Sequence, residues 1–111
     1  MMQLRIYSVA LQMVGQVAVV AQRVARADRD LARQMRRAST SVPLNISEGV
    51  HSRGGNQAAR FQNAMASARE TAAALEVSIA ARYITDDGLG ELLDRLDHIV
   101  ATLWKLIHRP R

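Results

Sequence analysis

Hydrophobic residues recur every three or four positions along most of the chain, with polar residues between them. The first such segment, at about residues 3–26, has the spacing of one helical face through Ile6, Val9, Met13, Val17, Val20 and Val24. Comparable rows run through about residues 28–50, 57–84 and 88–108. Because helices with short connections pack as antiparallel neighbours, the sequence predicts an all-α, up-and-down four-helix bundle in one domain over residues 1–111.

The first predicted helix has a wider apolar face than its own bundle needs. A second row lies beside the first and consists of Tyr7, Leu11, Val14, Ala18 and Ala21. Exposed to water, such a face would be an unusually large apolar patch, so we expect another subunit to cover it. The uncharged run from Ile6 to Gln22 is shorter than the ~20 residues of a membrane span and is interrupted by glutamines. We therefore expect neither a membrane segment nor a signal peptide.

The second predicted helix contains a proline, Pro43, next to its buried row of Leu31, Met35, Ala38, Val42 and Ile46. A proline lacks an amide hydrogen and clashes with the preceding turn, so this helix must kink at Pro43, or stop and restart there. The hydroxyl groups of Ser39, Thr40 and Ser41 are placed to bond the backbone groups that the proline frees.

The expected ends of the helices carry capping and turn residues. Asp28 is expected to cap the second helix and Asn56 the third. Gly49 and residues 52–56 predict the loop between these two helices, and residues 85–88 predict the next turn.

Composition narrows the classes of protein that fit this pattern. The chain has no cysteine, which excludes disulfides and thiolate metal sites and favours a cytoplasmic location. The formal net charge is +5. The excess lies in the first half, because residues 1–60 hold nine arginines against three acidic residues. Phosphate binding and a GC-rich genome explain the preference for arginine over lysine equally well.

Six arginines gather around the junction of the first and second predicted helices. We refer to them as the arginine stripe: Arg23, Arg26, Arg29, Arg33, Arg36 and Arg37. Steps of three or four place most of them on one face, as expected of a surface that contacts a phosphate backbone. The alternative is a solvated face, or salt bridges to another subunit. No aromatic residue lies between the arginines, so we expect binding that depends on salt and reads little sequence.

A row of polar side chains continues along the same helix at Arg37, Ser41, Asn45 and Glu48. Their spacing puts them on one face, beside the apolar row. A partly buried Glu48 would need a cationic or hydrogen-bonding partner, for which Arg37, Arg53 and Arg69 are candidates. One interpretation is a ligand site. We favour the other, a structural network that fixes the geometry of the proline-containing helix.

The sequence gives little sign of an active site or a metal centre. Among His51, His98 and His108, only His98 has a carboxylate at ligand spacing, that of Asp94 four positions earlier, and one such pair is common on helices. No glycine-rich loop follows a strand, and no nucleophile has a base and an orienting group beside it. We therefore expect no enzymatic activity, no metal and no cofactor.

Residues 41–49, S-V-P-L-N-I-S-E-G, together with Arg53, resemble the S-[IV]-P-x-N-I-[AS]-E-G…R motif of the bacterial 23S rRNA intervening-sequence proteins. Residues 34–39, Q-M-R-R-A-S, are similar to that family's Q-[LM]-R-R-A-S, and Ser67 and Glu70 match its G-S-x-x-E. The resemblance covers about residues 25–107. The chain departs from the family pattern at three positions. Ala66 replaces the glycine of G-S-x-x-E, Ala72 replaces a second glutamate of that helix, and Arg82 replaces the glycine of a G-Y-I motif.

The resemblance implies a left-handed bundle that assembles into a homopentamer. It also adds Ser67 and Glu70 to the structural polar network, whose other members are Ser41, Asn45, Glu48 and Arg53. In a related accessory protein of diversity-generating retroelements, the basic pentamer is associated with nucleic acid and a reverse transcriptase. We therefore expect a non-enzymatic, oligomeric bundle that binds the backbone of RNA or DNA. The alternative is a protein-interaction scaffold, for example for a polymerase or reverse transcriptase, with no direct nucleic-acid role.

Overall fold

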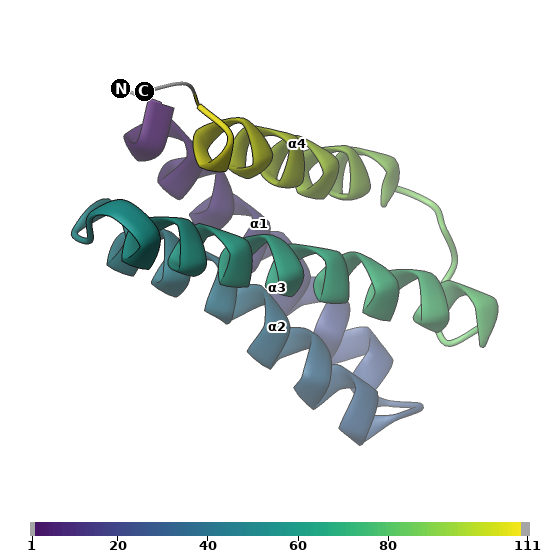
Figure 1. Cartoon of the computed structure of the whole chain (residues 1–111). Coiled ribbons are helices and arrows are strands. Elements are labelled where there is room, and N and C mark those ends of the chain that lie inside the picture. Colours follow the sequence, from purple (N-terminus) through teal and green to yellow (C-terminus); the bar gives the residue numbers. More distant parts are fainter. Residues whose placement is uncertain (1, 110–111) are drawn as a thin grey trace.

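The computed structural model describes the backbone of residues 2–109 and the side chains of residues 5–109. The helices are α1 (Met2–Ala25), α2 (Arg29–Val50), α3 (Gly54–Ala80) and α4 (Gly90–Ile107), and the described residues form no strand. The helices run side by side in an elongated body of 46 × 23 × 19 Å (Figure 1). The predicted all-α four-helix bundle is confirmed.

Each helix packs on the helix that follows it in the chain, and α1 also contacts α4, which closes the bundle. Figure 1 shows the start of α1 beside the end of α4, as up-and-down connectivity requires. Aliphatic side chains, methionines and one phenylalanine fill the space between the helices. The largest fully buried side chains include those of Phe61, Ile6, Met13, Met35, Ile46, Leu75, Leu92, Leu96, Ile99 and Leu103.

The chain itself buries most of the first predicted apolar row of α1 but only part of the second, in which Ala21 is buried and Tyr7 and Val14 are half-buried. Met13 of the first row is fully buried, whereas Leu11 and Ala18 of the second row are exposed. Leu11 is 48% exposed and the neighbouring Val19 is 54% exposed. By length and hydropathy alone, Arg5–Ala25 would also pass as a membrane span, as core helices of soluble bundles do. We define the α1 outer face as the exposed, uncharged residues Ser8, Leu11, Gly15, Ala18, Val19 and Gln22.

The start of α2 is capped as the sequence predicts. A carboxylate oxygen of Asp28 accepts a hydrogen bond from the backbone N–H of Leu31 at 2.9 Å. This bond satisfies one of the donors that the first turn of a helix leaves without an intrahelical partner. The cap also fixes the turn between α1 and α2, which carries part of the arginine stripe.

The proline does not interrupt α2. Residues 29–50 form one continuous helix with Pro43 buried inside it, so the alternative of a stop and a restart is wrong. The hydroxyl groups of Ser39 and Thr40 each donate to the carbonyl of Arg36 at 3.0 Å. They therefore bond the turn before the proline and not the Ser39 carbonyl that Pro43 leaves without an amide donor. The bend at Pro43 stays a prediction.

The connection between α2 and α3 is shorter than the sequence indicates. Gly49, expected in a loop, is a buried residue of α2, and α3 begins at Gly54 instead of about residue 57. Asn56 consequently lies inside α3, and Arg53 occupies the cap position without a side-chain cap bond. The side-chain amide of Gln57 donates to the carbonyl of Gly49 at 3.0 Å and so satisfies a carbonyl at the end of α2, not an N–H group of α3.

The far end of α3 also differs from the prediction. The helix ends at Ala80, not at about residue 84, in a Schellman-type cap. The N–H of Arg82 donates to the carbonyl of Ile79 at 3.0 Å, and that of Tyr83 to the carbonyl of Ser78 at 2.9 Å. This arrangement requires a left-handed backbone after the helix, and Arg82 has a φ of 65°.

The start of α4 is set by a second left-handed residue. Gly88 has a φ of 77°, far from the φ of about −60° inside an α-helix, and α4 begins at Gly90 and not at about residue 88. Leu89 occupies the cap position and is itself buried in the core.

Replacing Arg82 with glycine is expected to stabilise the bundle by about 0.5–1 kcal/mol. A side chain with a Cβ is strained in the left-handed region, whereas glycine is not, and this gain exceeds glycine's higher entropy in the unfolded chain. Urea unfolding followed by circular dichroism measures the change. Arg82→Ala is the control, because it removes the charge but keeps the Cβ. An equal gain in both variants would assign the effect to charge and contradict the backbone explanation.

Candidate nucleic-acid interface

The arginine stripe is fully on the surface. Arg23 lies in the last turn of α1, Arg26 in the turn that follows, and the other four on the first half of α2. All six side chains are exposed. Arg23 is also well placed electrostatically, because the C-terminal end of a helix favours positive charge.

The turn between α1 and α2 forms a hollow that gathers three of these arginines. Arg26, Arg29 and Arg33 line it together with Asp28 and Asp30. Arg33 and Asp30 form an ion pair at 3.7 Å, with side chains that are 68% and 83% exposed. Such a solvated pair contributes little free energy, about 0–1 kcal/mol, and an incoming anion can replace the aspartate. The two aspartates nevertheless make this end of the stripe less positive than its arginines suggest.

Asp28 holds the turn in place from two sides. Besides capping α2, its carboxylate accepts a long hydrogen bond of 3.4 Å from the hydroxyl of Tyr83, which lies after α3. The contact joins the turn before α2 to the connection before α4 and so restrains the backbone that carries Arg26 and Arg29. The sequence motif that contains Tyr83 gave no indication of this contact.

The most positive part of the stripe is one turn further along α2. Arg36 and Arg37 have no acidic residue three or four positions away on the helix. In the described part of the chain, neither guanidinium lies within ion-pair distance of a carboxylate. Both are therefore available to donate paired hydrogen bonds to the oxygens of a phosphate group.

Part of the predicted polar network joins α2 to α3. The hydroxyl groups of Ser41 and Ser67 are 2.9 Å apart, and the amide of Asn45 donates to the Ser41 hydroxyl and to the Ser41 carbonyl, each at 3.0 Å. Thr71 adds a bond from its hydroxyl to the Ser67 carbonyl at 2.8 Å. Ser41, Asn45 and Ser67 are half-buried and Thr71 is fully buried, and their bonds to one another have the character of a structural contact between helices.

The charged members of the predicted network lie outside it. Glu48, Arg53 and Glu70 are exposed, and their side chains make no hydrogen bond or ion pair with other described residues. Because Glu48 is exposed, the need for a partner that a partly buried carboxylate would have does not arise. Glu48 has the helical spacing of the polar row, but its side chain is exposed, whereas those of Ser41 and Asn45 are half-buried.

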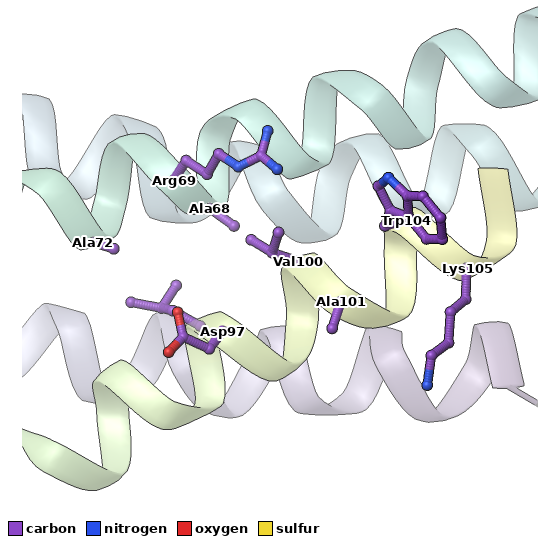
Figure 2. Close-up of a pocket in the computed structure, with 9 residues that line it drawn as sticks. Ala68, Arg69, Ala72, Asp97, Val100, Ala101, Trp104 and Lys105 are labelled. Carbon is purple, nitrogen blue, oxygen red and sulfur yellow. The ribbon is translucent and has the colours of Figure 1, made fainter. Parts of the chain in front are cut away.

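A groove between α3 and α4 was not foreseen from the sequence. It has a volume of about 520 Å³, and its lining includes Ala68 and Ala72 of α3 and Val100 of α4. Figure 2 shows these small side chains facing one another, with Trp104 at one end. Trp104 is 51% exposed and stacks on His108 with ring centroids 4.1 Å apart. Its position outside the apolar row of α4 is the signal in the sequence that could have revealed the groove.

Histidine, aspartate and glutamate side chains are dispersed over the described part of the chain. There, no three histidine, aspartate or glutamate side chains come together as metal ligands. The buried polar side chains, Ser39, Thr71 and Ser78, are hydroxyl groups whose bonds go to backbone carbonyls of the same helix. The arrangement thus offers surfaces and grooves for contact, with charge concentrated on one of them.

These features define a small, all-helical bundle protein with a basic surface built on α1 and α2. The chain belongs to the family of 23S rRNA-intervening sequence proteins, whose family model matches residues 2–105.

The fold is also found in a solved structure. The crystal structure of a protein of unknown function from the S23 ribosomal protein family of Bacteroides thetaiotaomicron is similar, with a TM-score of 0.86 and 20% sequence identity. The match covers 96% of this chain and 98% of the other. At this identity the likeness supports the fold alone. A comparison with curated proteins gives no match.

Proposed function

We propose that this protein is a non-enzymatic, oligomeric bundle that binds the phosphate backbone of RNA or DNA through the arginine stripe. The observation that carries the proposal is the exposure of all six guanidinium groups on neighbouring turns, with only a weak ion pair at Arg33 among them. Arg36 and Arg37, which have no acidic neighbour on the helix, are the central contacts. The family name and the basic first half of the chain point the same way.

Binding of this kind is driven by the release of counterions from the nucleic acid. Each arginine that neutralises a phosphate displaces a condensed cation, so the affinity falls steeply as salt rises. Contacts to phosphate fix the position of a nucleic acid but carry little sequence information. Hence the protein should accept many sequences and prefer structured RNA or duplexes over neutral ligands of similar size.

The test combines charge reversal with salt. Replacing Arg29, Arg33 and Arg36 with glutamate should weaken binding of a structured RNA by roughly a hundredfold or more at 50 mM salt, because repulsion replaces attraction at three neighbouring positions. The slope of log affinity against log salt should also become shallower. Filter binding at several salt concentrations measures both quantities.

A matched control keeps the same change in net charge elsewhere. Arg60→Glu, Arg69→Glu and Arg82→Glu alter three exposed arginines of α3 and its cap. We expect this variant to retain most of the affinity. An equal loss in both variants would mean that only the total charge matters, and unchanged binding in the stripe variant would refute the proposal.

The oligomer proposed here has its support in the α1 outer face. A helix face with exposed Leu11 and Val19 and no charge from Ile6 to Gln22 is suited to contact with another copy of the chain. Five copies, as the family resemblance implies, would bring several arginine stripes onto one particle. Repeated weak phosphate contacts would then add to a high overall avidity.

A second candidate function rests on the same face. If the α1 outer face contacts a different protein, for example a polymerase or reverse transcriptase, the bundle is a scaffold and the arginine stripe binds acidic protein surfaces. A pull-down of partner protein that survives nuclease treatment favours the scaffold. Loss of the partner after nuclease favours the nucleic-acid function.

A further inference from the structure

A second concentration of positive charge lies at the other end of the bundle, where α1 begins and α4 ends. A small hollow there, of about 210 Å³, is lined by Arg5 and Ile6 of α1 and by His98, Thr102 and Lys105 of α4. Arg5 and the first arginines of the turn after α1 are about 30 Å apart along the helix axis. The hollow is therefore separate from the arginine stripe.

The two charged side chains that line this hollow, Arg5 and Lys105, are both basic. Arg5 and Lys105 carry permanent positive charges, and within the described residues neither forms an ion pair. No aspartate or glutamate is among the described residues that line it. Lys105 also lines the α3–α4 groove, together with Asp97, and Asp94 lies one turn before His98 on α4. In Figure 2 the side chain of Lys105 extends away from Trp104 and toward α1.

The positive charge at this end of the bundle does not follow from the composition of the nearby sequence. Residues 61–111 hold six basic and seven acidic residues, so the second half of the chain has no positive excess from which such a cluster would arise by chance. The fold creates it by bringing Arg5, from the basic first half, against the side of α4 that carries Lys105 and His98. Charge of one sign around a concave site raises the local concentration of counter-ions.

The donors in the hollow suit a compact anion with several oxygens. The guanidinium of Arg5 supplies paired N–H groups, and the ammonium of Lys105 supplies a point charge. The Thr102 hydroxyl and the His98 ring can each add a hydrogen bond. A phosphate monoester presents three terminal oxygens and carries close to two negative charges near neutral pH. In a phosphodiester the nucleic-acid chain continues on both sides of the phosphate. Such a group fits an open surface better than a hollow of this size.

We propose that Arg5, His98, Thr102 and Lys105 form a binding site for a phosphate monoester. The proposal does not rest on the function assigned to the arginine stripe. Two sources can supply such a group: the terminal phosphate of a polynucleotide, or a small phosphorylated molecule, with inorganic phosphate as the simplest probe.

The first experiment titrates the full-length protein with inorganic phosphate and follows the ring signals of His98 by NMR at constant pH and ionic strength. His98→Gln assigns the signal. We expect a saturable shift that is lost in Arg5→Gln and in Lys105→Gln. Arg60→Gln removes the same charge from an exposed arginine of α3 outside the hollow and should leave the shift intact. A shift that does not saturate, or one that all three variants lose equally, overturns the proposal.

The second experiment identifies the source of the phosphate. Two single-stranded RNAs of one sequence, with a 5′-phosphate or a 5′-hydroxyl, are compared by fluorescence anisotropy. Preference for the phosphorylated RNA by roughly tenfold, lost in Arg5→Gln and Lys105→Gln, assigns the site to a nucleic-acid end. Equal binding of both RNAs, together with a saturable phosphate shift, supports the site and assigns it to a small phosphorylated molecule.

The hollow of Arg5 and Lys105 and the arginine stripe can be tested separately. The variant with Arg29, Arg33 and Arg36 changed to glutamate should bind both RNAs more weakly, with the same factor of loss in affinity for each. The phosphate-induced shift of His98 should persist in this variant. Loss of the His98 shift in that variant would contradict a separate site. Absence of both the shift and the 5′-phosphate preference in the unaltered protein would refute the site and leave the function of the stripe unaffected.

Discussion

Replacing Gly49 with alanine is expected to destabilise the bundle by about 2 kcal/mol. A Cβ at this position would lie 2.5 and 2.6 Å from two ring carbons of Phe61. Phe61 is only 1% exposed and packed on every side, so its ring cannot swing away. Overpacking typically costs about 1–3 kcal/mol, and contacts this short with a fully buried ring belong at the upper end of that range. Subtracting the ~1 kcal/mol that alanine normally gains over glycine in a helix leaves a net loss of about 2 kcal/mol. Thermal unfolding should show a midpoint lower by about 8 °C.

Two further variants separate the steric clash from other effects. Gly55→Ala makes the same chemical change in the first turn of α3, where a Cβ meets nothing within 4 Å, and should be neutral or slightly stabilising. Phe61→Leu alone should destabilise by leaving a cavity. Combined with Gly49→Ala it should cost less than the sum of the two single changes, because the smaller side chain makes room for the new methyl group. Strict additivity would rule out the clash.

Placing glutamate at Leu11 and Ala18 of the α1 outer face is expected to break the proposed oligomer into single chains. Covering this face with another subunit would bury both carboxylates without partners, which weakens association by roughly a hundredfold or more. Light scattering after size exclusion should give a multiple of 12.3 kDa for the unaltered protein and 12.3 kDa for the variant. Helical circular dichroism should persist, since both side chains are exposed in the single chain.

The matched control places glutamate at two other exposed apolar positions. Leu44 on α2 and Val77 on α3 are 66% and 52% exposed, and neither belongs to the α1 outer face. This variant should keep the mass of the unaltered protein. A mass of 12.3 kDa for the unaltered protein at micromolar concentration would contradict the oligomer. Dissociation of the control variant would instead place the interface on α2 or α3.

Features of the fold that depend on local chemistry were predictable from the sequence. Periodic apolar residues gave the number and order of the helices, and a single aspartate, Asp28, marked the start of α2 through its side-chain bond to Leu31. The first row of α1 entered the core because its spacing matches one face of a helix.

The positions that were missed depend on contacts between distant parts of the chain. Gly49 looks like a loop residue, but it is needed in the helix because Phe61 of α3 approaches there. Arg82 gave no sign of ending α3, because a left-handed residue is normally glycine. Glu48 has the spacing of the polar row, yet only its place relative to α3 decides whether it is buried.

The candidate sites likewise differ in whether neighbouring residues or distant parts of the chain form them. The arginine stripe is contiguous in sequence, so its members could be named in advance. The hollow of Arg5, His98 and Lys105 joins the two ends of the described chain and arises only when α1 and α4 come together. The groove beside Trp104 likewise depends on the distance that alanines set between α3 and α4.

The modest packing of α4 has a consequence for the dynamics of the protein. α4 contacts α3 and α1 less extensively than α2 contacts its two neighbours. Local unfolding follows the least buried elements, so the backbone amides of α4 should exchange with deuterium before those of α2. Both the groove and the hollow of Arg5 and Lys105 are built partly on α4. A ligand held in either place would act as a clamp and slow this exchange while leaving the average shape of the bundle unchanged.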